Sequence, residues 1–318
     1  MMKKLVSLVL ALMLCLSCVS ALAAEAWTVT CPWAPSGVAA MVNQKAASLS
    51  TTYSQDYVLV ANAEKGDTAT INSWLTKYTE ADPQMCFIGE GMFGITAILD
   101  PERMNFTYDD FKYVENLYSS IFVASARKEL GITSIDALKA YLEEGNQIMV
   151  GTNGATGSEA FLAAALIGAM GYGDQFYLIP YESAAEAAQA VARGEVDIAV
   201  SHQSQILETW QQGGVDVFAA FDGKPIAQGP FKGVEGVGQY GYPYFRNRCF
   251  IFAKAGADEQ KIADLKALYA QILTDEEMVD WLNNTMLLEA DVMTEEEVIA
   301  HIDNVKNIVD EYYDLVAE

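Results

Sequence analysis

Short hydrophobic runs alternate with longer segments of helical periodicity along most of this chain. The hydrophobic runs predict strands over residues 26–31, 57–61, 84–89, 111–118, 122–125, 147–151, 175–180, 196–200 and 249–253. Apolar positions spaced three and four apart predict helices over residues 38–49, 67–79, 134–144, 158–170, 183–193, 258–273, 275–284 and 294–317. Strands that alternate with helices are typical of parallel α/β proteins, so we expect that fold class.

Two segments depart from this pattern. The predicted helix 158–170 is apolar on nearly every side, and we interpret it as a buried helix because it is too short to span a bilayer. Residues 222–244 are rich in Gly, Pro and aromatic residues without a regular period. Such a composition indicates a long surface segment or a crossover between two parts of the fold.

The N-terminus reads as a targeting segment. Two lysines precede an apolar run, and Ala21 and Ala23 supply the small residues of a signal-peptidase site, so we expect residues 1–23 to be a signal peptide. In an alternative reading, Cys18 is lipidated and anchors the chain to the outside of a membrane. Either reading predicts an extracytoplasmic protein, periplasmic or secreted in the first case and a membrane-anchored lipoprotein in the second.

Composition narrows the possible functions. The chain has 318 residues, which suffices for two domains, and 19 Lys and Arg against 43 Asp and Glu give a net charge of −24. A nucleic-acid partner is disfavoured, because binding to phosphates requires clustered Lys and Arg. With only two histidines, His202 and His301, and no suitable spacing, we expect no metal site and no cofactor.

Three cysteines remain after the expected cleavage: Cys31, Cys86 and Cys249. They are too few and too widely spaced for a disulfide framework or a CxxC metal site, so we interpret them as buried apolar residues. One pair among them could be bridged in an oxidising compartment.

Enzyme motifs are missing from the sequence. There is no GxGxxG, P-loop, GxSxG or HExxH pattern, and the paired carboxylates occur at helix starts or on solvated faces. A secreted hydrolase is therefore the weakest interpretation, and we expect no catalytic residues.

Four predicted strands instead end in small, Gly- or Ser-containing loops that open helices. These loops are Pro35–Gly37, Gly89–Gly91, Thr156–Ser158 and Tyr181–Ala184. The start of a helix has unpaired backbone N–H groups and the positive end of the helix dipole, so it attracts anions. Several such ends that converge would hold a carboxylate without an arginine, although each loop alone could simply cap its helix.

In these loops and several other segments, the chain resembles the TctC or Bug family, the extracytoplasmic solute receptors of tripartite tricarboxylate transporters. Residues 32–37 (PWAPSG) resemble the family's P-aromatic-x-P-G-G loop, and residues 58–66 (VLVANAEKG) resemble its V-V-V-E-N segment. Residues 104–111 (MNFTYDDF) are similar to its Y-D-x-x-x-D-F stretch. Residues 150–158 resemble its Y-G-S-x-G-x-G loop, residues 179–185 its V-P-Y-x-G segment, and residues 194–198 its G-x-V-D turn.

The resemblance implies a type II periplasmic-binding-protein fold, α/β in class, with two lobes and a hinge of two crossovers. Residues 24–118 and 246–318 would form lobe 1, residues 119–245 would form lobe 2, and the ligand cleft would lie between them. The implied first-lobe contacts are Trp33, Ser36, Gly37, Glu90 and Gly91. The implied second-lobe contacts are Thr152, Asn153, Thr156, Gly157, Ser158, Tyr181, Ser183, Ala184, Ser201, His202 and Gln203.

The implied function is to capture a small organic carboxylate and deliver it to the permease subunits of a membrane transporter, with the receptor acting as a monomer. An alternative is a sensor subunit that presents the bound carboxylate to a signalling receptor. The sequence leaves open which carboxylate is bound. Arg246 and Arg248 lie near the predicted second crossover, from which an arginine could reach the ligand.

Overall fold

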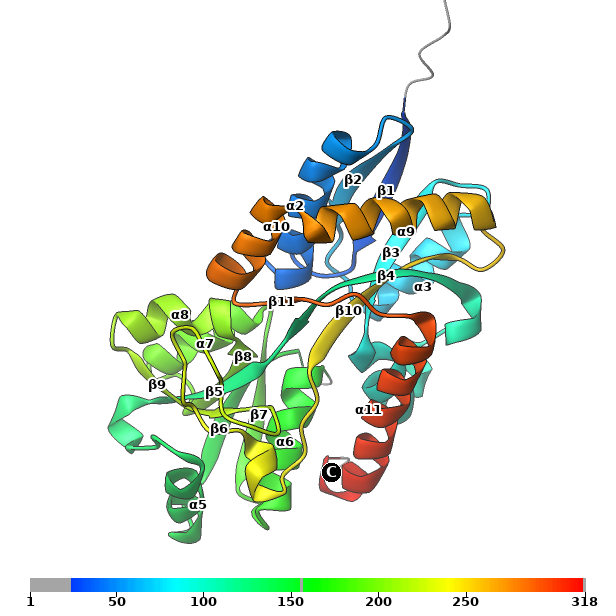
Figure 1. Ribbon diagram of the computed structural model, residues 1–318. Coiled ribbons are helices and arrows are strands. Elements are labelled where there is room, and N and C mark those ends of the chain that lie inside the picture. Colours follow the sequence, from blue (N-terminus) through cyan, green and yellow to red (C-terminus); the bar gives the residue numbers. More distant parts are fainter. Residues whose placement is uncertain (1–23, 155–156, 317–318) are drawn as a thin grey trace, which may run out of the picture.

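Two separate β-sheets divide the protein into two α/β lobes, as the ribbon in Figure 1 shows. This computed structural model describes residues 24–154 and 157–316; the expected signal peptide and the alternative lipidation site at Cys18 lie outside the described residues. The two-lobed α/β fold expected from the sequence is confirmed.

The lobe 1 sheet has the strand order β11-β4-β10-β3-β1-β2. Its strands are β1 (Glu25–Cys31), β2 (Tyr57–Ala63), β3 (Gln84–Gly89), β4 (Phe111–Ser120), β10 (Asn247–Lys254) and β11 (Glu289–Ala290). The strand β1 pairs in parallel with β2 and β3, whereas β10 runs antiparallel to β3 and β4. The carboxyl ends of β1, β2 and β3 therefore lie along one edge of the sheet.

The lobe 2 sheet has the strand order β7-β6-β8-β5-β9. Its strands are β5 (Phe122–Arg127), β6 (Ile148–Asn153), β7 (Phe176–Tyr181), β8 (Ile198–His202) and β9 (Val215–Ala220). The strand β6 pairs in parallel with β7 and β8, and β5 is antiparallel to β8 and β9. Each lobe therefore has three parallel strands that end at one edge.

Most of the helices that cover the sheets lie at the positions that the periodicity predicts. They are α2 (Val38–Tyr53), α3 (Thr68–Lys77), α4 (Ala97–Leu99), α5 (Ile135–Glu143), α6 (Ser158–Ala169), α7 (Ala184–Ala192), α8 (Gln203–Gln211), α9 (Glu259–Thr274), α10 (Glu276–Asp280) and α11 (Glu295–Val316). Short π-helical turns occur at Met92–Thr96 and Trp281–Met286, and 3-10 turns at Pro101–Arg103, Tyr108–Asp110, Lys128–Leu130 and Val237–Tyr240. Among the described residues, none of the helices is long and apolar enough to cross a membrane.

The chain passes between the lobes twice. The first crossover is very short, because only Ile121 separates β4 from β5. The second runs through residues 221–246, the Gly- and aromatic-rich segment, whose only helical turn within that stretch is Val237–Tyr240. Figure 1 shows β4 and β10 side by side where they leave the upper lobe.

The C-terminal helix α11 belongs to both lobes. Val298 and Ile302 join a lobe 1 core with Phe250, whereas Val305 and Val309 join the lobe 2 core that contains Phe161. These four positions follow the helical spacing that places residues on one face. The sequence expectation assigns residues 246–318 to lobe 1; in the structure the apolar stripe of α11 packs on both lobes.

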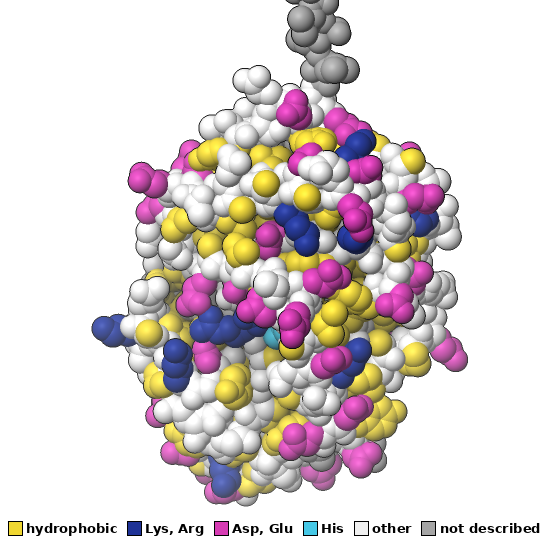
Figure 2. All heavy atoms as spheres, turned by 45° about the vertical axis from the view of Figure 1, so that its right-hand side comes forward, with side chains coloured by type: hydrophobic (Ala, Val, Ile, Leu, Met, Phe, Trp, Pro, Cys, Tyr) yellow, Lys and Arg dark blue, Asp and Glu magenta, His cyan; other side chains and the backbone are white. Residues whose placement is uncertain are grey.

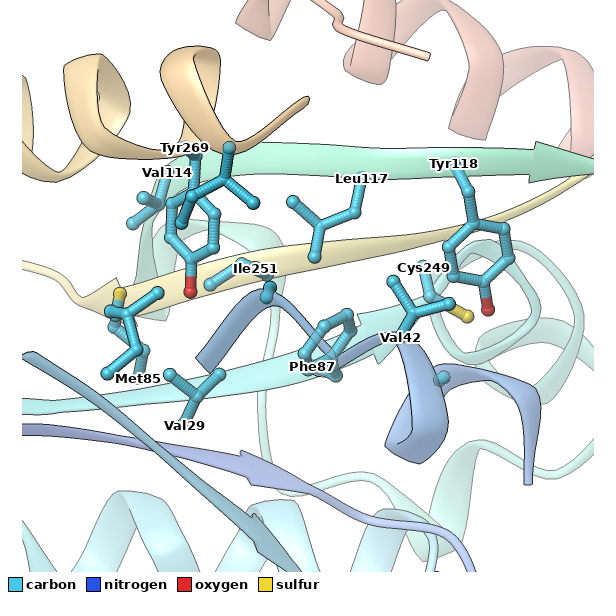
Figure 3. Packing of buried hydrophobic residues seen from close by; sticks show 14 of the residues in the cluster. Val29, Val42, Met85, Phe87, Val114, Leu117, Tyr118, Cys249, Ile251 and Tyr269 are labelled. Atoms are coloured by element: carbon cyan, nitrogen blue, oxygen red, sulfur yellow. The ribbon is translucent and has the colours of Figure 1, made fainter. Parts of the chain in front are cut away.

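The core of lobe 1 fixes where its strands end. Figure 3 shows Val29 of β1, Phe87 of β3 and Ile251 of β10 packed together, with Tyr118 and Cys249 side by side at one end of this cluster. All of them are buried. Since a protein core is close-packed, the strands and the loops that follow them hold defined positions.

Four of the observed helices and strands were not predicted from the sequence pattern, namely α4, α8, β9 and β11. Only Gln203 and Ile206 of α8 are buried, so the helix lacks the apolar stripe on which the prediction depends. The strand β8 also runs from Ile198 to His202, two residues later than the expected 196–200. This shift brings His202 to the strand end.

The three described cysteines, Cys31, Cys86 and Cys249, are buried free thiols, in agreement with their interpretation as apolar residues. Burial raises the pKa of the Cys31 thiol to about 12. The acidic side chains are different, since they are spread over the face seen in Figure 2. Beyond the Debye length of about 8 Å at physiological salt, such exposed charges are largely screened.

Candidate functional site

A cavity of about 430 Å³ opens between the lobes at the carboxyl ends of the parallel strands. This is the place where open α/β sheets bind ligands, and the volume falls within the range of small-molecule sites. The lining from lobe 1 and β10 is Pro32, Trp33, Ala34, Gly37, Val38, Ala39, Lys65, Gly66, Asp67, Gly89, Glu90, Gly91, Met92, Thr96, Arg103, Tyr118, Asn247 and Cys249. The lining from lobe 2 is Phe122, Asn153, Gly154, Gly157, Ser158, Glu159, Tyr181, Glu182, Ser183, Ala184, His202 and Gln205.

The start of α2 faces this cavity from lobe 1. Gly37 is the N-cap, and its own N–H donates to the Ala34 carbonyl at 2.8 Å, which shapes the loop. The first N–H groups of a helix have no partner within the helix, and Gly37 has no side chain to cap them. The first turn of α2 also contains no acidic residue. This helix start can therefore donate hydrogen bonds to an anion.

Asp67 and Trp33 form the wall beside this helix start. The backbone of Asp67 has a φ of 50°, a strained value for a residue with a side chain, and its N–H donates to the Pro32 carbonyl at 2.9 Å. Burial raises the pKa of Asp67, while Arg103 and a hydrogen bond from the Trp33 side chain act in the opposite direction. Arg103 lies 3.4 Å from the Asp67 carboxylate, so the two side chains form an ion pair.

Glu90, at the end of β3, is a fully buried carboxyl group in the floor of the cavity. Its Oε1 accepts hydrogen bonds from Ser158 Oγ at 3.1 Å and Asn247 Nδ2 at 2.9 Å, and its Oε2 accepts one from the Arg248 N–H at 2.7 Å. Burial raises the pKa of Glu90 to about 7, although these donors act in the opposite direction. Glu90 thereby connects β3 and β10 of lobe 1 with the start of α6 in lobe 2.

Glu159, in the first turn of α6, is a second buried carboxyl group in the same lining. Its pKa is raised to about 7, chiefly by burial and also by the Glu90 charge, against the lowering effect of a hydrogen bond from the Asn153 side chain. Two buried carboxyl groups that interact in this way hold protons near neutral pH more readily than exposed acids do.

Aromatic rings line much of the remaining wall. They belong to Trp33, Tyr118, Phe122 and Tyr181. The imidazole of His202 is tilted by 48° against the Phe122 ring, with the ring centroids 4.7 Å apart, and its Nδ1 lies 2.8 Å from Ser120 Oγ. Burial lowers the pKa of His202 to about 3, so this side chain is neutral at physiological pH.

An ion pair joins the two lobes at the mouth of the cavity. Lys65, in the loop after β2, lies 2.7 Å from the carboxylate of Glu182, in the loop after β7. Both side chains are more than half exposed, at 54% and 77%. An exposed pair of this kind contributes little to stability, but it has to break if the lobes separate here.

Most of the residues that the sequence and the resemblance single out lie together in this cavity. They are Trp33, Gly37, Glu90, Gly91, Asn153, Gly157, Ser158, Tyr181, Ser183, Ala184 and His202. The other described candidates, Ser36, Thr152, Ser201 and Gln203, lie outside the lining, and Thr156 falls outside the described residues.

The physical reasons for these exceptions are local. Ser36 is exposed on the outer side of its loop, and the Thr152 hydroxyl donates to the Gly154 carbonyl at 2.7 Å instead of facing the cavity. Ser201 is buried next to His202, and successive strand residues point to opposite faces. On α8, Gln205 rather than Gln203 reaches the lining.

The two arginines near the second crossover also lie outside the lining. Arg246 pairs with Asp222 at 3.0 Å and with Glu289, and the Arg248 side chain pairs with Asp291 at 2.7 Å. Only the backbone N–H of Arg248 reaches the cavity floor, through Glu90.

Sequence reasoning missed five charged residues of the lining: Lys65, Asp67, Arg103, Glu159 and Glu182. Lys65 and Asp67 carry a weak signal, since they flank Gly66 in a loop between a predicted strand and a helix. Arg103 comes from a short turn far along the chain, and only the fold brings it to Asp67.

Two α/β lobes connected by crossovers, with a cavity between them at the strand ends, define the class of two-lobed periplasmic binding proteins. The chain belongs, more particularly, to the tripartite tricarboxylate transporter family receptors (TctC), whose family pattern matches residues 55–306. This confirms the family that the sequence motifs indicate. Its members and the solved neighbours are binding proteins rather than enzymes.

Solved structures show the same fold at low sequence identity. An R. palustris protein, Rpa4515 with adipate, is 15% identical, with 91% of this chain and 96% of that chain covered and a TM-score of 0.80. MatC from Rhodopseudomonas palustris with bound malate is 17% identical, with 92% and 98% covered and a TM-score of 0.76. The periplasmic binding protein BugD is 16% identical, with 92% and 98% covered and a TM-score of 0.77. The sequence has no match among curated proteins.

Proposed function

We propose that this protein is an extracytoplasmic receptor that captures a small organic carboxylate in the cavity between its lobes. The observation that carries the proposal is the start of α2, which faces the cavity with a glycine N-cap and without an acidic residue in its first turn. Hydrogen bonds from such N–H groups to a carboxylate are charge-assisted, and each contributes roughly 1.5–3 kcal/mol. A few of them suffice for micromolar affinity.

The relatives support the chemical class of the ligand. Structures of the same fold hold adipate and malate, both of which are carboxylates. In this chain the ligand-binding residues that we propose are the predicted ones that line the cavity, above all Trp33, Gly37, Ser158, Tyr181 and Ser183. Lys65 and Arg103 also line the cavity, and each pairs with an acidic side chain there, Glu182 and Asp67 respectively.

We further propose that the closed receptor delivers its ligand to the permease subunits of a tripartite tricarboxylate-type transporter in the membrane. The family match supports this partner, and it also supports a periplasmic location after removal of the signal peptide. In this proposal, residues 24–118 with 246–318 and residues 119–245 form the two parts that close on the ligand, and α11 packs on both of them.

Calorimetry tests the binding function. The mature protein is titrated with mono-, di- and tricarboxylates and with amino acids, and at least one compound should bind in a 1:1 complex. A panel in which none of the compounds binds would contradict the proposal. Uptake of the identified ligand by vesicles that contain the permease should then require this protein; uptake that proceeds equally well without it would contradict the transport role.

A further inference from the structure

The charge balance of the cavity is unusual for a site that binds only anions. Its described lining contains the acidic side chains Asp67, Glu90, Glu159 and Glu182 against the basic side chains Lys65 and Arg103. Lys65 pairs with Glu182, and Arg103 pairs with Asp67. Both basic residues therefore already neutralise an acid, while Glu90 and Glu159 have no basic partner among these lining residues.

The starts of α2 and α6 face the cavity with opposite electrostatic character. The first turn of α2 contains no acidic residue. The first turn of α6 contains Glu159, and its Ser158 hydroxyl donates to the Glu90 carboxylate. Two carboxyl groups thus offset the positive end of the α6 dipole, and a ligand carboxylate is favoured at α2 rather than at α6.

Glu159 is better suited than Glu90 to contact a ligand. Glu90 already accepts hydrogen bonds from Ser158, Asn247 and the Arg248 N–H. Glu159 is 6% exposed and lines the cavity, and Asn153 is the one side chain that lowers its pKa by hydrogen bonding. A buried carboxylate with few donors gains most from a charged donor on a ligand.

The aromatic wall favours the same kind of ligand group. Trp33 and Tyr181 are partly exposed and line the cavity together with these acids, whereas Tyr118 and Phe122 are each 1% exposed. The faces of aromatic rings attract cations, by about 0.5–2 kcal/mol depending on desolvation, and Trp does so most strongly. Accessible rings and carboxylates in one cavity favour ammonium groups.

We propose that the ligand carries a positively charged nitrogen in addition to its carboxylate, as an amino acid or a related zwitterion does, and that Glu159 determines this specificity. The ligand carboxylate binds at the start of α2, and the ammonium group lies between Glu159 and the aromatic wall. The inference rests on the proposed function, because it concerns the ligand of the same cavity.

Matched ligand pairs test this specificity. Calorimetry compares compounds that differ only by an α-amino group: propionate with alanine, succinate with aspartate, glutarate with glutamate, and 3-phenylpropionate with phenylalanine. In the pair that fits the cavity, the amino compound should bind at least about tenfold more tightly, the effect of one charge-assisted hydrogen bond. Glu159→Gln should abolish this preference.

Glu143→Gln is the matched control, because it removes the same charge from an exposed position on α5. This variant should retain the preference for the amino compound. A tighter complex with the plain carboxylate in every pair, or an unchanged preference in Glu159→Gln, would overturn the inference while leaving the proposed function intact. If neither series binds, the proposed function itself fails, and the inference fails with it.

A second measurement uses the unmodified protein and so does not depend on the folding of a variant. Titrations at pH 7 in two buffers with different ionisation enthalpies count the protons exchanged on binding. An ammonium group favours the ionised form of Glu159, whose pKa burial raises to about 7, so the amino compound should release protons. Uptake of protons with the amino compound would contradict its placement beside Glu159.

Discussion

The starts of α2 and α6 face the same cavity from opposite lobes, and they differ in what they offer a ligand. Both begin after a glycine N-cap without a side-chain cap, Gly37 for α2 and Gly157 for α6. The first turn of α2 has no acidic residue, whereas α6 has Glu159 in its first turn and Glu90 bonded to Ser158.

The difference between α2 and α6 shows that a helix start is not by itself an anion-binding site. The dipole and the N–H groups are common to every helix, but nearby carboxyl groups decide whether the local field attracts an anion or a cation. The following predictions test whether the two starts differ as the structure indicates.

The largest effect is expected from an acid at the start of α2. Gly37 has extended backbone angles that any residue can adopt, so Gly37→Asp can cap the helix while it places a negative charge where the ligand carboxylate binds. Binding of the best carboxylate should weaken by about 100-fold or more, from the loss of N–H donors and the added repulsion. Calorimetry measures this loss.

Gly37→Ser is the matched control, since it caps the helix without adding a charge. Its loss of affinity should be several times smaller than that of Gly37→Asp. Equal losses in the two variants would show that steric crowding against the Ala34 carbonyl, 3.1 Å from an added Cβ, dominates instead.

The second effect is a change in the pH dependence of folding stability, and it tests Glu159 in the first turn of α6. The pKa of Glu159 is raised to about 7, so the folded protein holds a proton that the unfolded chain releases near its ordinary value of 4.5. Stability from this group is therefore present at low pH and is lost as the pH rises from about 4.5 through 7. Relative to the unmodified protein, Glu159→Gln should gain roughly 2 kcal/mol between pH 5 and pH 8.

Urea denaturation at the two pH values measures that gain, and the difference between the proteins is the informative quantity. Burial lowers the pKa of both His202 and His301 to about 3, so their contributions rise with pH from about 3 to 6.5 and oppose the glutamate effect in either protein alone. Glu143→Gln should show no such gain. A constant difference across the pH range would mean that Glu159 is ionised throughout.

The third effect is the loss of one hydrogen bond between the lobes. Ser158→Ala removes a donor from the buried Glu90 carboxylate and should lower the free energy of unfolding by about 1–2 kcal/mol at pH 8. At pH 5 the loss should shrink, because Glu90, with a pKa of about 7, is then protonated. Ser158→Thr retains the hydroxyl and serves as the control; an equal loss at both pH values would argue against the bond to Glu90.

The smallest effect is expected at the mouth of the cavity. Lys65→Ala and Glu182→Ala remove the exposed ion pair between the lobes, and each should change ligand affinity by less than about threefold. The change should disappear in 1 M salt, where such pairs are screened. A tenfold effect that persists in high salt would mean that one of these side chains contacts the ligand directly.

Much of the fold is predictable because burial leaves a periodic trace in the sequence. The helix α6 is buried along nearly its whole length and the strand β3 is buried on both faces, so their hydrophobic runs are unmistakable. The helix α8 has no comparable run of apolar positions in the sequence, since only Gln203 and Ile206 are buried. The sharing of α11 between both lobes is likewise a property of the tertiary structure, because its apolar stripe does not reveal what packs on it.

The candidate site is predictable where it consists of loops after strands, and less so where side chains from distant segments meet. Gly37 and Ser183 follow predicted strands and open helices, which is a local signal. Glu159 also has a local interpretation, as an acid that complements a helix dipole, and only its burial beside Glu90 gives it a different role. Arg103 has no local signal at all.

The position of α11 constrains how this receptor can open. Val298 and Ile302 pack on one lobe and Val305 and Val309 on the other, along a single stiff helix. A rigid rod anchored at both ends allows its two supports to turn about it far more easily than to pull apart. We therefore expect the lobes to rotate about a line beside this helix, so that the rim of the cavity farthest from it moves the most.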